Sequence, residues 1–396
     1  MLKSPIVIVS AKRTPIGRFG GSFAKTPATE LGGFAVKAAL KEAGVNPDDV
    51  DSVLIGMARQ AGARPNPARQ VAFNADIPEA ATAFTINQAC ASGLKSLQLA
   101  ADELIAGRAK VAIAGGIENM SLVPHYLENM RDGYRLGDSK VIDGMYRDGF
   151  SCPLSNMVMG ETAELLAVER KISRAEQDEF ALNSQQKAAA AQEAGYFDTQ
   201  IAPVTLVTRR GEIVVNKDEH VRSNTTIEGL GKLPGVFAEK DGTVTPGNAS
   251  GITDGAAALV MMTADEAERR GLSPLAIFLD SQIAGTDPKR MGLGPVPATQ
   301  QLFERTGLSY DDFGLFEINE AFAAQTLACL QEMPINPELL NVNGGSIALG
   351  HPIGCTGARI TVTLLHEMKR RNVDKGLATL CVSGGLGITG AFELIS

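Results

Sequence analysis

The sequence has 396 residues, with 44% hydrophobic and 21% charged residues and a formal net charge of −8. A chain of this length exceeds one ordinary core, so about two to three structural units are expected. An acidic chain without a basic run is a poor candidate for binding nucleic acid or an anionic membrane. The five cysteines form no C-x-x-C pair, and their odd number favours a reducing compartment, the cytoplasm, over a disulfide framework.

Signals for targeting or metal binding are not found in the sequence. Residues 1–9 contain neither the apolar region nor the cleavage site of a signal peptide, and no segment has the roughly 18 apolar residues that span a bilayer. The four histidines show no zinc-binding spacing. We therefore expect no metal site and no membrane-spanning segment.

Short β-branched runs alternate with amphipathic helical stretches in the first 120 residues. Buried strands are expected at 7–9, 52–55, 84–87 and 110–114, and helices at 29–43, 66–74 and 94–106. Thr29 can cap the first helix, and Asn66 followed by Pro67 is a good start for the second. This alternation of strands and helices indicates an α/β layered fold.

Residues 121–247 read differently from the rest. Asp-Gly turns are expected at 132–133, 143–144 and 148–149. Ser173 and Glu176 form a capping box that opens a long helix, and a hairpin-like pair follows around Arg210. This section therefore reads as an insertion, after which strands and helices alternate again to the end.

The two ends of the chain look like copies of one unit. The paired segments, in the same order, are 50–55 with 312–318, 86–87 with 342–343, and 110–116 with 377–385. We infer a duplicated α/β half with a long insert in the first copy. The predicted division is an N-terminal half of residues 1–120 plus 248–270, an insert of residues 121–247, and a C-terminal half of residues 271–396.

Cys90 lies in Asn-Gln-Ala-Cys-Ala-Ser-Gly, between a predicted strand and a predicted helix. Free backbone N–H groups and the positive end of a helix dipole favour thiolate over thiol at such a junction. The small residues that follow would let a substrate approach closely. The alternative is a buried structural cysteine, which is common.

Three further residues are candidates for chemistry. His351 lies in a glycine-rich loop, where it is well placed to activate a thiol, whereas His366 is expected on the surface of a helix. Cys381 ends an apolar run, and a thiol there can give and take a proton. Asn319 follows a predicted strand, so it can hold a water, donate to an oxyanion or simply cap a helix.

Four segments together resemble the active-site blocks of the thiolase family, in that family's order. They are Asn-Gln-Ala-Cys-Ala-Ser-Gly at 87–93, Asn-Glu-Ala-Phe-Ala at 319–323, Gly-His-Pro-Ile-Gly at 350–354 and Cys-Val-Ser-Gly-Gly at 381–385. The resemblance spans essentially the whole chain. It implies a five-layered αβαβα fold of two similar halves, with the insert forming a loop domain that holds coenzyme A.

The resemblance also implies a role for each candidate. Cys90 is acylated, His351 activates it, and Cys381 moves a proton at the α-carbon of the thioester. Asn319 positions a water that forms one oxyanion hole with His351, and the backbone N–H groups of Cys90 and Ser383 form the other. The residues that match contacts to substrate are Ala249 and Ser250 at pantetheine, Arg222 near the nucleotide, and Met159, Met291 and Phe322 in the acyl pocket.

The sequence thus predicts a thiolase that condenses or cleaves 3-oxoacyl-CoA by a ping-pong reaction, in the first place an acetyl-CoA C-acetyltransferase acting on acetoacetyl-CoA. Coenzyme A is a substrate, and no tightly bound cofactor is expected. The alternatives are a longer-chain 3-ketoacyl-CoA thiolase of β-oxidation and a non-catalytic acyl-CoA or lipid carrier, which should have lost one of the three reactive residues. A ketosynthase or hydroxymethylglutaryl-CoA synthase would want a second histidine or a glutamate at Cys381.

Departures from the family pattern leave the acyl chain length open. Ser383 stands where many members have glycine, Val158 where short-chain members often have histidine, and residues 151–155 are atypical. The segment 131–149 resembles the loop that joins thiolase dimers into tetramers, so a homotetramer is expected.

Overall fold

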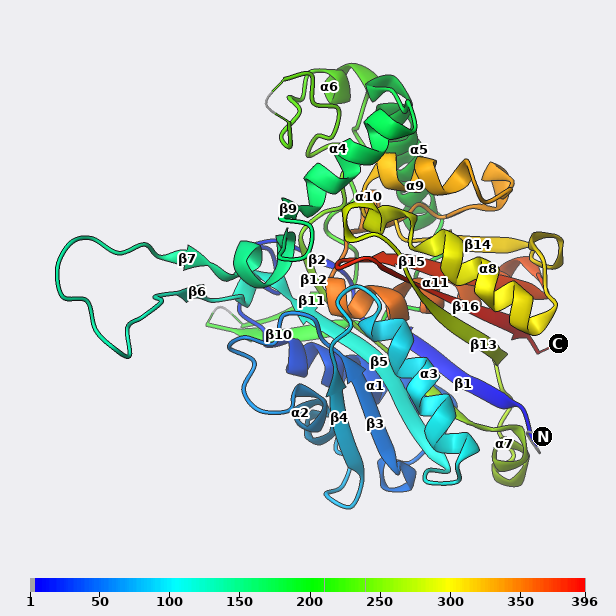
Figure 1. The fold of residues 1–396 in the computed structure, drawn as a ribbon. Coiled ribbons are helices and arrows are strands. Elements are labelled where there is room, and N and C mark those ends of the chain that lie inside the picture. Colours follow the sequence, from blue (N-terminus) through cyan, green and yellow to red (C-terminus); the bar gives the residue numbers. More distant parts are fainter. Residues whose placement is uncertain (1–3, 210, 239, 396) are drawn as a thin grey trace.

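The computed structural model describes residues 4–209, 211–238 and 240–395, so Arg210 at the expected hairpin tip lies outside the described residues. A mixed sheet forms its centre, in the order β14-β15-β16-β13-β1-β12-β5-β3-β4, with β2 beside β12 (Figure 1). The strands are β1 (Ile6–Arg13), β2 (Gly17–Arg18), β3 (Ser52–Gly56), β4 (Thr82–Ile86), β5 (Val111–Asn119), β12 (Thr253–Thr263), β13 (Ala276–Gly285), β14 (Leu315–Ile318), β15 (Lys375–Val382) and β16 (Leu386–Leu394).

The sheet consists of two similar halves that join at one short contact. Val7 and Ile8 of β1 pair antiparallel with β13. On one side of this junction β12 is antiparallel to β5, and β5 is parallel to β3; on the other, β16 is antiparallel to β15, and β15 is parallel to β14. The predicted duplication is confirmed, but residues 342–343 form no strand, and an isolated bridge from Leu340 to Phe316 stands in the place of β4.

Helices form three layers around these halves (Figure 1). The inner layer contains α3 (Ser92–Ile105) and α11 (Ile353–Arg371), which pack together; α11 contacts β5 and β12 on one side and β14 and β15 on the other. The outer layers are α1 (Ala28–Ala43) against β1 and β12, and α8 (Pro295–Thr306) against β13 and β16. The predicted five-layered αβαβα fold is therefore confirmed.

Local sequence signals account for several helix ends. The Asn66 side chain accepts from the Arg69 N–H at the start of α2 (Pro67–Asn74), and Ser173 does the same for Glu176 at α5 (Arg174–Glu193). Thr29 is not the cap of α1, because the helix begins one residue earlier, after Pro27. The remaining short helices are α7 (Ala264–Arg270), α9 (Ala323–Leu330) and α10 (Ser346–Leu349).

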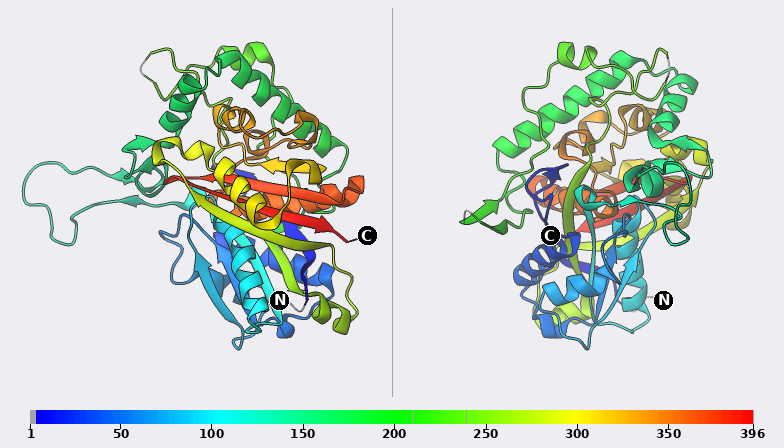
Figure 2. Two further views of the ribbon diagram at one scale, coloured as in Figure 1. Left: turned by 45° about the vertical axis from the view of Figure 1, so that its right-hand side comes forward. Right: turned by 90° about the vertical axis from the view of Figure 1, so that its left-hand side faces the viewer.

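The section 121–247 lies mainly along one end of the sheet, with an arm between β6 and β7 that projects from the body (Figure 1; Figure 2, left). Its elements are β6 (His125–Tyr126), β7 (Ile142–Asp143), β8 (Ser151–Cys152), β9 (Met157–Val158), α4 (Met159–Glu169), α5, β10 (Val204–Thr208), β11 (Gly211–Val215) and α6 (Ile227–Gly231). Val204 and Val215 join the core of the first half. The three-part division of the chain stays a prediction.

Two predictions about this section and its neighbours need correction. The turn prediction fails at two places: Asp143 ends β7 and is followed by helical Gly144, and residues 148–149 lie in a π-helical turn, Tyr146–Phe150. The strand expected at 84–87 forms as β4, but it is not buried. It lies at the edge of the sheet, where no further strand of the described residues covers it, and the Phe84 side chain is 39% exposed. Within the described residues no helix combines the length and apolarity of a bilayer crossing.

His366 is not the surface residue that the sequence suggested. Its Nε2 lies 2.8 Å from the Ala11 carbonyl oxygen and its Nδ1 3.0 Å from Thr199 Oγ1. Burial lowers the pKa of His366 to about 4, although the carbonyl of Ala11 acts in the opposite direction. The polar face of α11 is covered here by β1 and by the turn at residue 199, which a helical pattern alone does not reveal.

Candidate functional site

Cys90 lies in the sharp turn between β4 and α3. Ala89 has a φ of +46°, in the left-handed region, and Gln88 bridges to Cys90. The Cys90 sulfur faces its own backbone N–H and that of Ser383, and its side chain packs against Met120 and Ile353. The turn thus brings the two backbone donors predicted for an oxyanion hole to one sulfur atom.

Burial raises the pKa of the Cys90 thiol, against the opposing effects of the Ser383 N–H and the Arg59 guanidinium. The backbone N–H of Cys90 at the helix start does favour thiolate, as the sequence predicted, but burial has the larger effect. Desolvation in this packed turn outweighs the nearby donors. The resting Cys90 is a neutral thiol and needs a base before it can attack a carbonyl group.

His351 is the candidate for that base. It follows α10 and precedes α11, and its backbone N–H donates to the Gly251 carbonyl at 3.0 Å. Its Nδ1 lies 2.6 Å from Thr356 Oγ1, and the Thr356 hydroxyl donates to the Pro352 carbonyl at 2.9 Å. Because the Thr356 hydroxyl gives its only proton to the Pro352 carbonyl, its oxygen must accept from His351. In the neutral ring Nδ1 therefore carries the proton and Nε2 carries the lone pair.

The charge state of His351 follows from its surroundings. Burial lowers its pKa to about 3, and the positive charges of Arg359 and Arg59 add to the effect. Neutral imidazole and neutral thiol are thus the resting partners at neutral pH. A base of this kind takes a proton only when substrate and oxyanion donors stabilise the charges that form.

Asn319 lies beyond the end of β14, beside this histidine. Its Nδ2 is 3.5 Å from His351 Nε2, and its Oδ1 accepts from the Ser346 hydroxyl at 2.6 Å. It does not cap a helix, since α9 begins at Ala323 with Phe322 as the cap residue. The structure therefore brings the Asn319 amide and the His351 ring together, as the sequence predicted.

Cys381 is a second buried thiol near Cys90. Burial raises its pKa well above the ordinary value, and negative charge on Cys90 raises it further. The residues around it are apolar: Met159, Met291, Ala321 and Cys152 form one cluster with it, against which Phe322 packs. Cys381 is therefore a protonated thiol among the residues predicted to form the acyl pocket.

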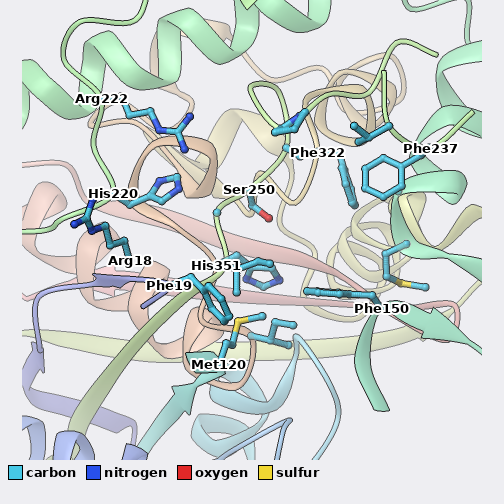
Figure 3. Close-up of a pocket in the computed structure, with 18 of the residues that line it drawn as sticks. Arg18, Phe19, Met120, Phe150, His220, Arg222, Phe237, Ser250, Phe322 and His351 are labelled. Atoms are coloured by element: carbon cyan, nitrogen blue, oxygen red, sulfur yellow. The ribbon is translucent and has the colours of Figure 1, made fainter. Parts of the chain in front are cut away.

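A cavity of about 700 Å³ opens beside His351 (Figure 3). Ser250 lies near its middle, with Phe322 and Phe237 on one side and Arg18, His220 and Arg222 grouped on the other. Ala249 and Met159 also line it, as do Met120 and Ile353, which belong to the apolar cluster against which Cys90 packs. The cavity thus joins a cationic end to an apolar end, with the histidine between.

Sequence reasoning missed several residues of this site. Arg18, Phe19 and His220 line the cavity but belong to segments whose spacing carries no recognisable signal. Glu118 was also missed: it accepts from the backbone N–H groups of Arg59 at 3.1 Å and Gly354 at 2.8 Å. A carboxylate in a mostly apolar run is the feature of the sequence that could have indicated a role for it.

Cys152 was also overlooked as a thiol of the site. Burial raises its pKa, but the Ser155 hydroxyl and the backbone N–H groups of Ser155, Leu154 and Gly384 outweigh that effect, and the pKa lies below the ordinary value. The atypical loop 151–155 thus packs against the glycine turn that follows Cys381.

The protonation states make a testable prediction. The rate at which iodoacetamide alkylates Cys90 should rise continuously from about pH 6 to about pH 9, because a neutral thiol reacts only through its small thiolate fraction. Time-resolved intact-mass measurement, with Cys90→Ala to identify the labelled thiol, gives the profile. A rate that already levels off below neutral pH would instead show a thiolate–imidazolium pair.

Comparison with known proteins identifies the family of the chain. The Thiolase, N-terminal domain model matches residues 6–265, and the Thiolase, C-terminal domain model matches residues 272–394. The acetyl-CoA acetyltransferase of Cupriavidus necator is 52% identical over 389 residues, covering 98% of this chain and 99% of that protein. That of Escherichia coli is 51% identical over 391 residues, covering 98% and 99%.

Solved structures give the same result. The acetyl-CoA acetyltransferase of Bacillus anthracis superimposes with a TM-score of 0.97 at 45% identity, covering 99% of both chains. Human mitochondrial 3-ketoacyl-CoA thiolase in complex with CoA superimposes with a TM-score of 0.95 at 41% identity, covering 100% of this chain and 99% of that one. By sequence, by fold and over its full described length, this chain belongs to the thiolase family.

Proposed function

We propose that this thiolase is an acetyl-CoA C-acetyltransferase, which forms or cleaves acetoacetyl-CoA through an acyl-Cys90 intermediate. The observation that carries the proposal is the pairing of two thiols, the half-buried Cys90 and the buried Cys381, close enough for the charge on one to raise the pKa of the other. One thiol can hold an acyl group while the other handles a proton. The relatives at about 50% identity named acetyl-CoA acetyltransferase support it.

The first half-reaction in the cleavage direction uses both thiols. His351 Nε2 takes the Cys90 proton, and the thiolate attacks the 3-oxo carbonyl carbon; the oxyanion lies against the N–H groups of Cys90 and Ser383. The carbon–carbon bond breaks, leaving an acyl thioester on Cys90. Cys381 gives its proton to the α-carbon of the departing enolate, whose oxygen is held beside His351 and Asn319.

The second half-reaction restores the enzyme. The Cys381 thiolate takes the thiol proton of coenzyme A, whose sulfur then attacks the Cys90 thioester. The tetrahedral adduct uses the same two N–H groups, and Cys90 leaves as it regains its proton from His351. Protons and charges balance over the cycle, so no metal or redox group is required by the chemistry, and we propose that no cofactor is tightly bound.

The long cavity suits coenzyme A. We propose that Arg18, His220 and Arg222 hold its phosphates and that Ala249 and Ser250 contact pantetheine. The two arginines supply local donors on an otherwise acidic chain. The human mitochondrial thiolase solved with CoA supports this assignment for a protein of the same fold.

A longer-chain 3-ketoacyl-CoA thiolase is the second candidate. Val158 lines the cavity and gives it an apolar wall, and human mitochondrial 3-ketoacyl-CoA thiolase superimposes with a TM-score of 0.96 at 42% identity. Against it, Met159 and Met291 belong to the same apolar cluster as Cys381, and Phe322 packs against that cluster, which favours a small acyl group.

Substrate chain length separates the two candidates. For coenzyme A-dependent cleavage, we expect kcat/KM for acetoacetyl-CoA to exceed that for 3-oxodecanoyl-CoA by about 10-fold or more, since misplaced methylene groups each cost on the order of 1–3 kcal/mol. Steady-state assays over a series of 3-oxoacyl-CoA lengths measure this ratio. A ratio near or below one would establish the longer-chain thiolase, and no cleavage of any length would support a carrier.

We also propose a homotetramer of the cytoplasm that serves lipid metabolism. The arm between β6 and β7 exposes Leu127, Met130, Leu136 and Val141, and the edge strand β4 exposes Phe84. Exposed apolar side chains in such numbers favour contact with further copies of the chain. All five cysteines are free, which fits a reducing compartment.

A further inference from the structure

A continuous line of side chains leads from a buried cation to the proposed oxyanion site. Arg359 of α11 is fully buried, and its Nη2 donates to Ser346 Oγ at 2.6 Å. The Ser346 hydroxyl donates to Asn319 Oδ1 at 2.6 Å. The other end of the amide, Asn319 Nδ2, faces His351 Nε2 at 3.5 Å.

The direction of each hydrogen bond in this line is fixed by chemistry. A guanidinium has only donors, so Ser346 Oγ accepts from Arg359 and keeps its own proton to give away. The acceptor it meets is the carbonyl end of the Asn319 amide. With the amide reversed, the hydroxyl proton would lose its acceptor and the amide oxygen would face the His351 Nε2 lone pair, so both ends oppose reversal.

Arg359 has little else to engage. Within the described residues, its Nε and Nη1 have no hydrogen-bond partner, and neither has Oε2 of Glu317. Burial raises the pKa of Glu317 to about 8, so this carboxyl is mainly protonated at neutral pH and does not cancel the cation. The bond to Ser346 is therefore the direct contact through which Arg359 acts on the site.

We propose that Ser346 is a positioning residue that, held by Arg359, locks the Asn319 amide with its NH₂ group toward the reacting carbonyl oxygen. A water bound to that NH₂ group accepts from it and keeps both hydrogens for the enolate oxygen. With the amide reversed, the water would have to give one hydrogen to the amide oxygen. The inference rests on the proposed function and deepens its account of enolate stabilisation.

The test compares enolate formation with acyl transfer in Ser346→Ala. Exchange of the acetyl-CoA methyl protons with D₂O reports enolate formation, and the burst of acyl-Cys90, followed by rapid quench and intact mass, reports acyl transfer. We expect exchange to fall about 10-fold, less than loss of an oxyanion donor itself, while the burst rate changes less than about 2-fold. Ser346→Thr retains the hydroxyl and should restore most of the exchange.

Matched controls separate this role from a general loss of packing. Thr361→Ala also removes a buried hydroxyl, but this one lies in α11 and donates only to the Gly357 carbonyl. This variant should leave both rates unchanged. Unchanged exchange in Ser346→Ala overturns the proposal, as does an equal fall of both rates. Wild type is measured first. If it forms no acyl-Cys90, the proposed function fails, and the variants do not test the role of Ser346.

Discussion

Replacing Cys90 with alanine is expected to abolish the acyl adduct and to lower kcat by about 10⁴- to 10⁶-fold, the range seen when a catalytic nucleophile is removed. The Cys90 sulfur faces the backbone N–H groups of Cys90 and Ser383, the pair proposed to hold the oxyanion, so we expect no other side chain to take its place in the same geometry. Incubation with acetyl-CoA or acetoacetyl-CoA, followed by intact mass, should show one acetyl group on wild type and none on Cys90→Ala.

The control for this experiment is Cys355→Ala. Cys355 is also buried, and burial raises its pKa to about 12, but it lies in the core of α11 away from the cavity. This variant should still carry the acetyl group. Persistence of the adduct in Cys90→Ala, with peptide mapping to Cys152 or Cys381, would show that a different thiol is the nucleophile.

The sequence could show where Cys90 and Asn319 lie relative to strands and helices because the signals for those elements are local. Cys90 and Asn319 lie just beyond strand ends, and such ends are marked by β-branched runs followed by small or polar residues. The duplication was visible for the same reason, since both halves repeat the same local runs. Asn66 and Ser173 likewise begin helices through bonds to residues three positions away.

The protonation of the site could not be predicted from such signals. The helix start next to Cys90 suggests thiolate, but the pKa is set mainly by how many atoms pack around the sulfur. Those atoms come from distant segments, as do Arg59 and Glu118, which act on Cys90 in opposite directions. Desolvation is a property of the assembled fold, so the local pattern gave the place of the thiol but not its charge.

For the same reason, the sequence predicted the wrong exposure for two residues. His366 was assigned to the surface from the polar side of its helix, yet β1 closes over that side. Phe84 was assigned to the core from an apolar run, yet its strand lies at the sheet edge. A periodic pattern identifies an element and its faces, but what covers each face depends on segments far away in the chain.

Replacing Cys381 with alanine is expected to separate the two chemical steps. Acetyl transfer between Cys90 and coenzyme A loses Cys381 as the group that exchanges a proton with the coenzyme A thiol, but the nucleophile and the backbone N–H groups remain, and His351 can pass the Cys90 proton to coenzyme A directly. Exchange of labelled coenzyme A into acetyl-CoA should therefore stay within about 10-fold of wild type. Condensation of two acetyl groups should fall by about 10³-fold or more, since the thiolate that takes the proton from the α-carbon in this direction is lost. The two assays on one preparation give the ratio directly.

Cys329→Ala is the matched control for that variant. Cys329 is a buried thiol whose pKa burial raises to about 12, but its sulfur donates to the Gly292 carbonyl in the core near α9. Its loss should leave the ratio of condensation to exchange unchanged. A Cys381→Ala protein that still joins two acetyl units at the wild-type rate would refute the proton-transfer role of Cys381. Cys152 lies in the same apolar cluster, and its lowered pKa makes it the other thiol that could take the proton. The double variant Cys152→Ala/Cys381→Ala then decides whether that thiol acts in its place.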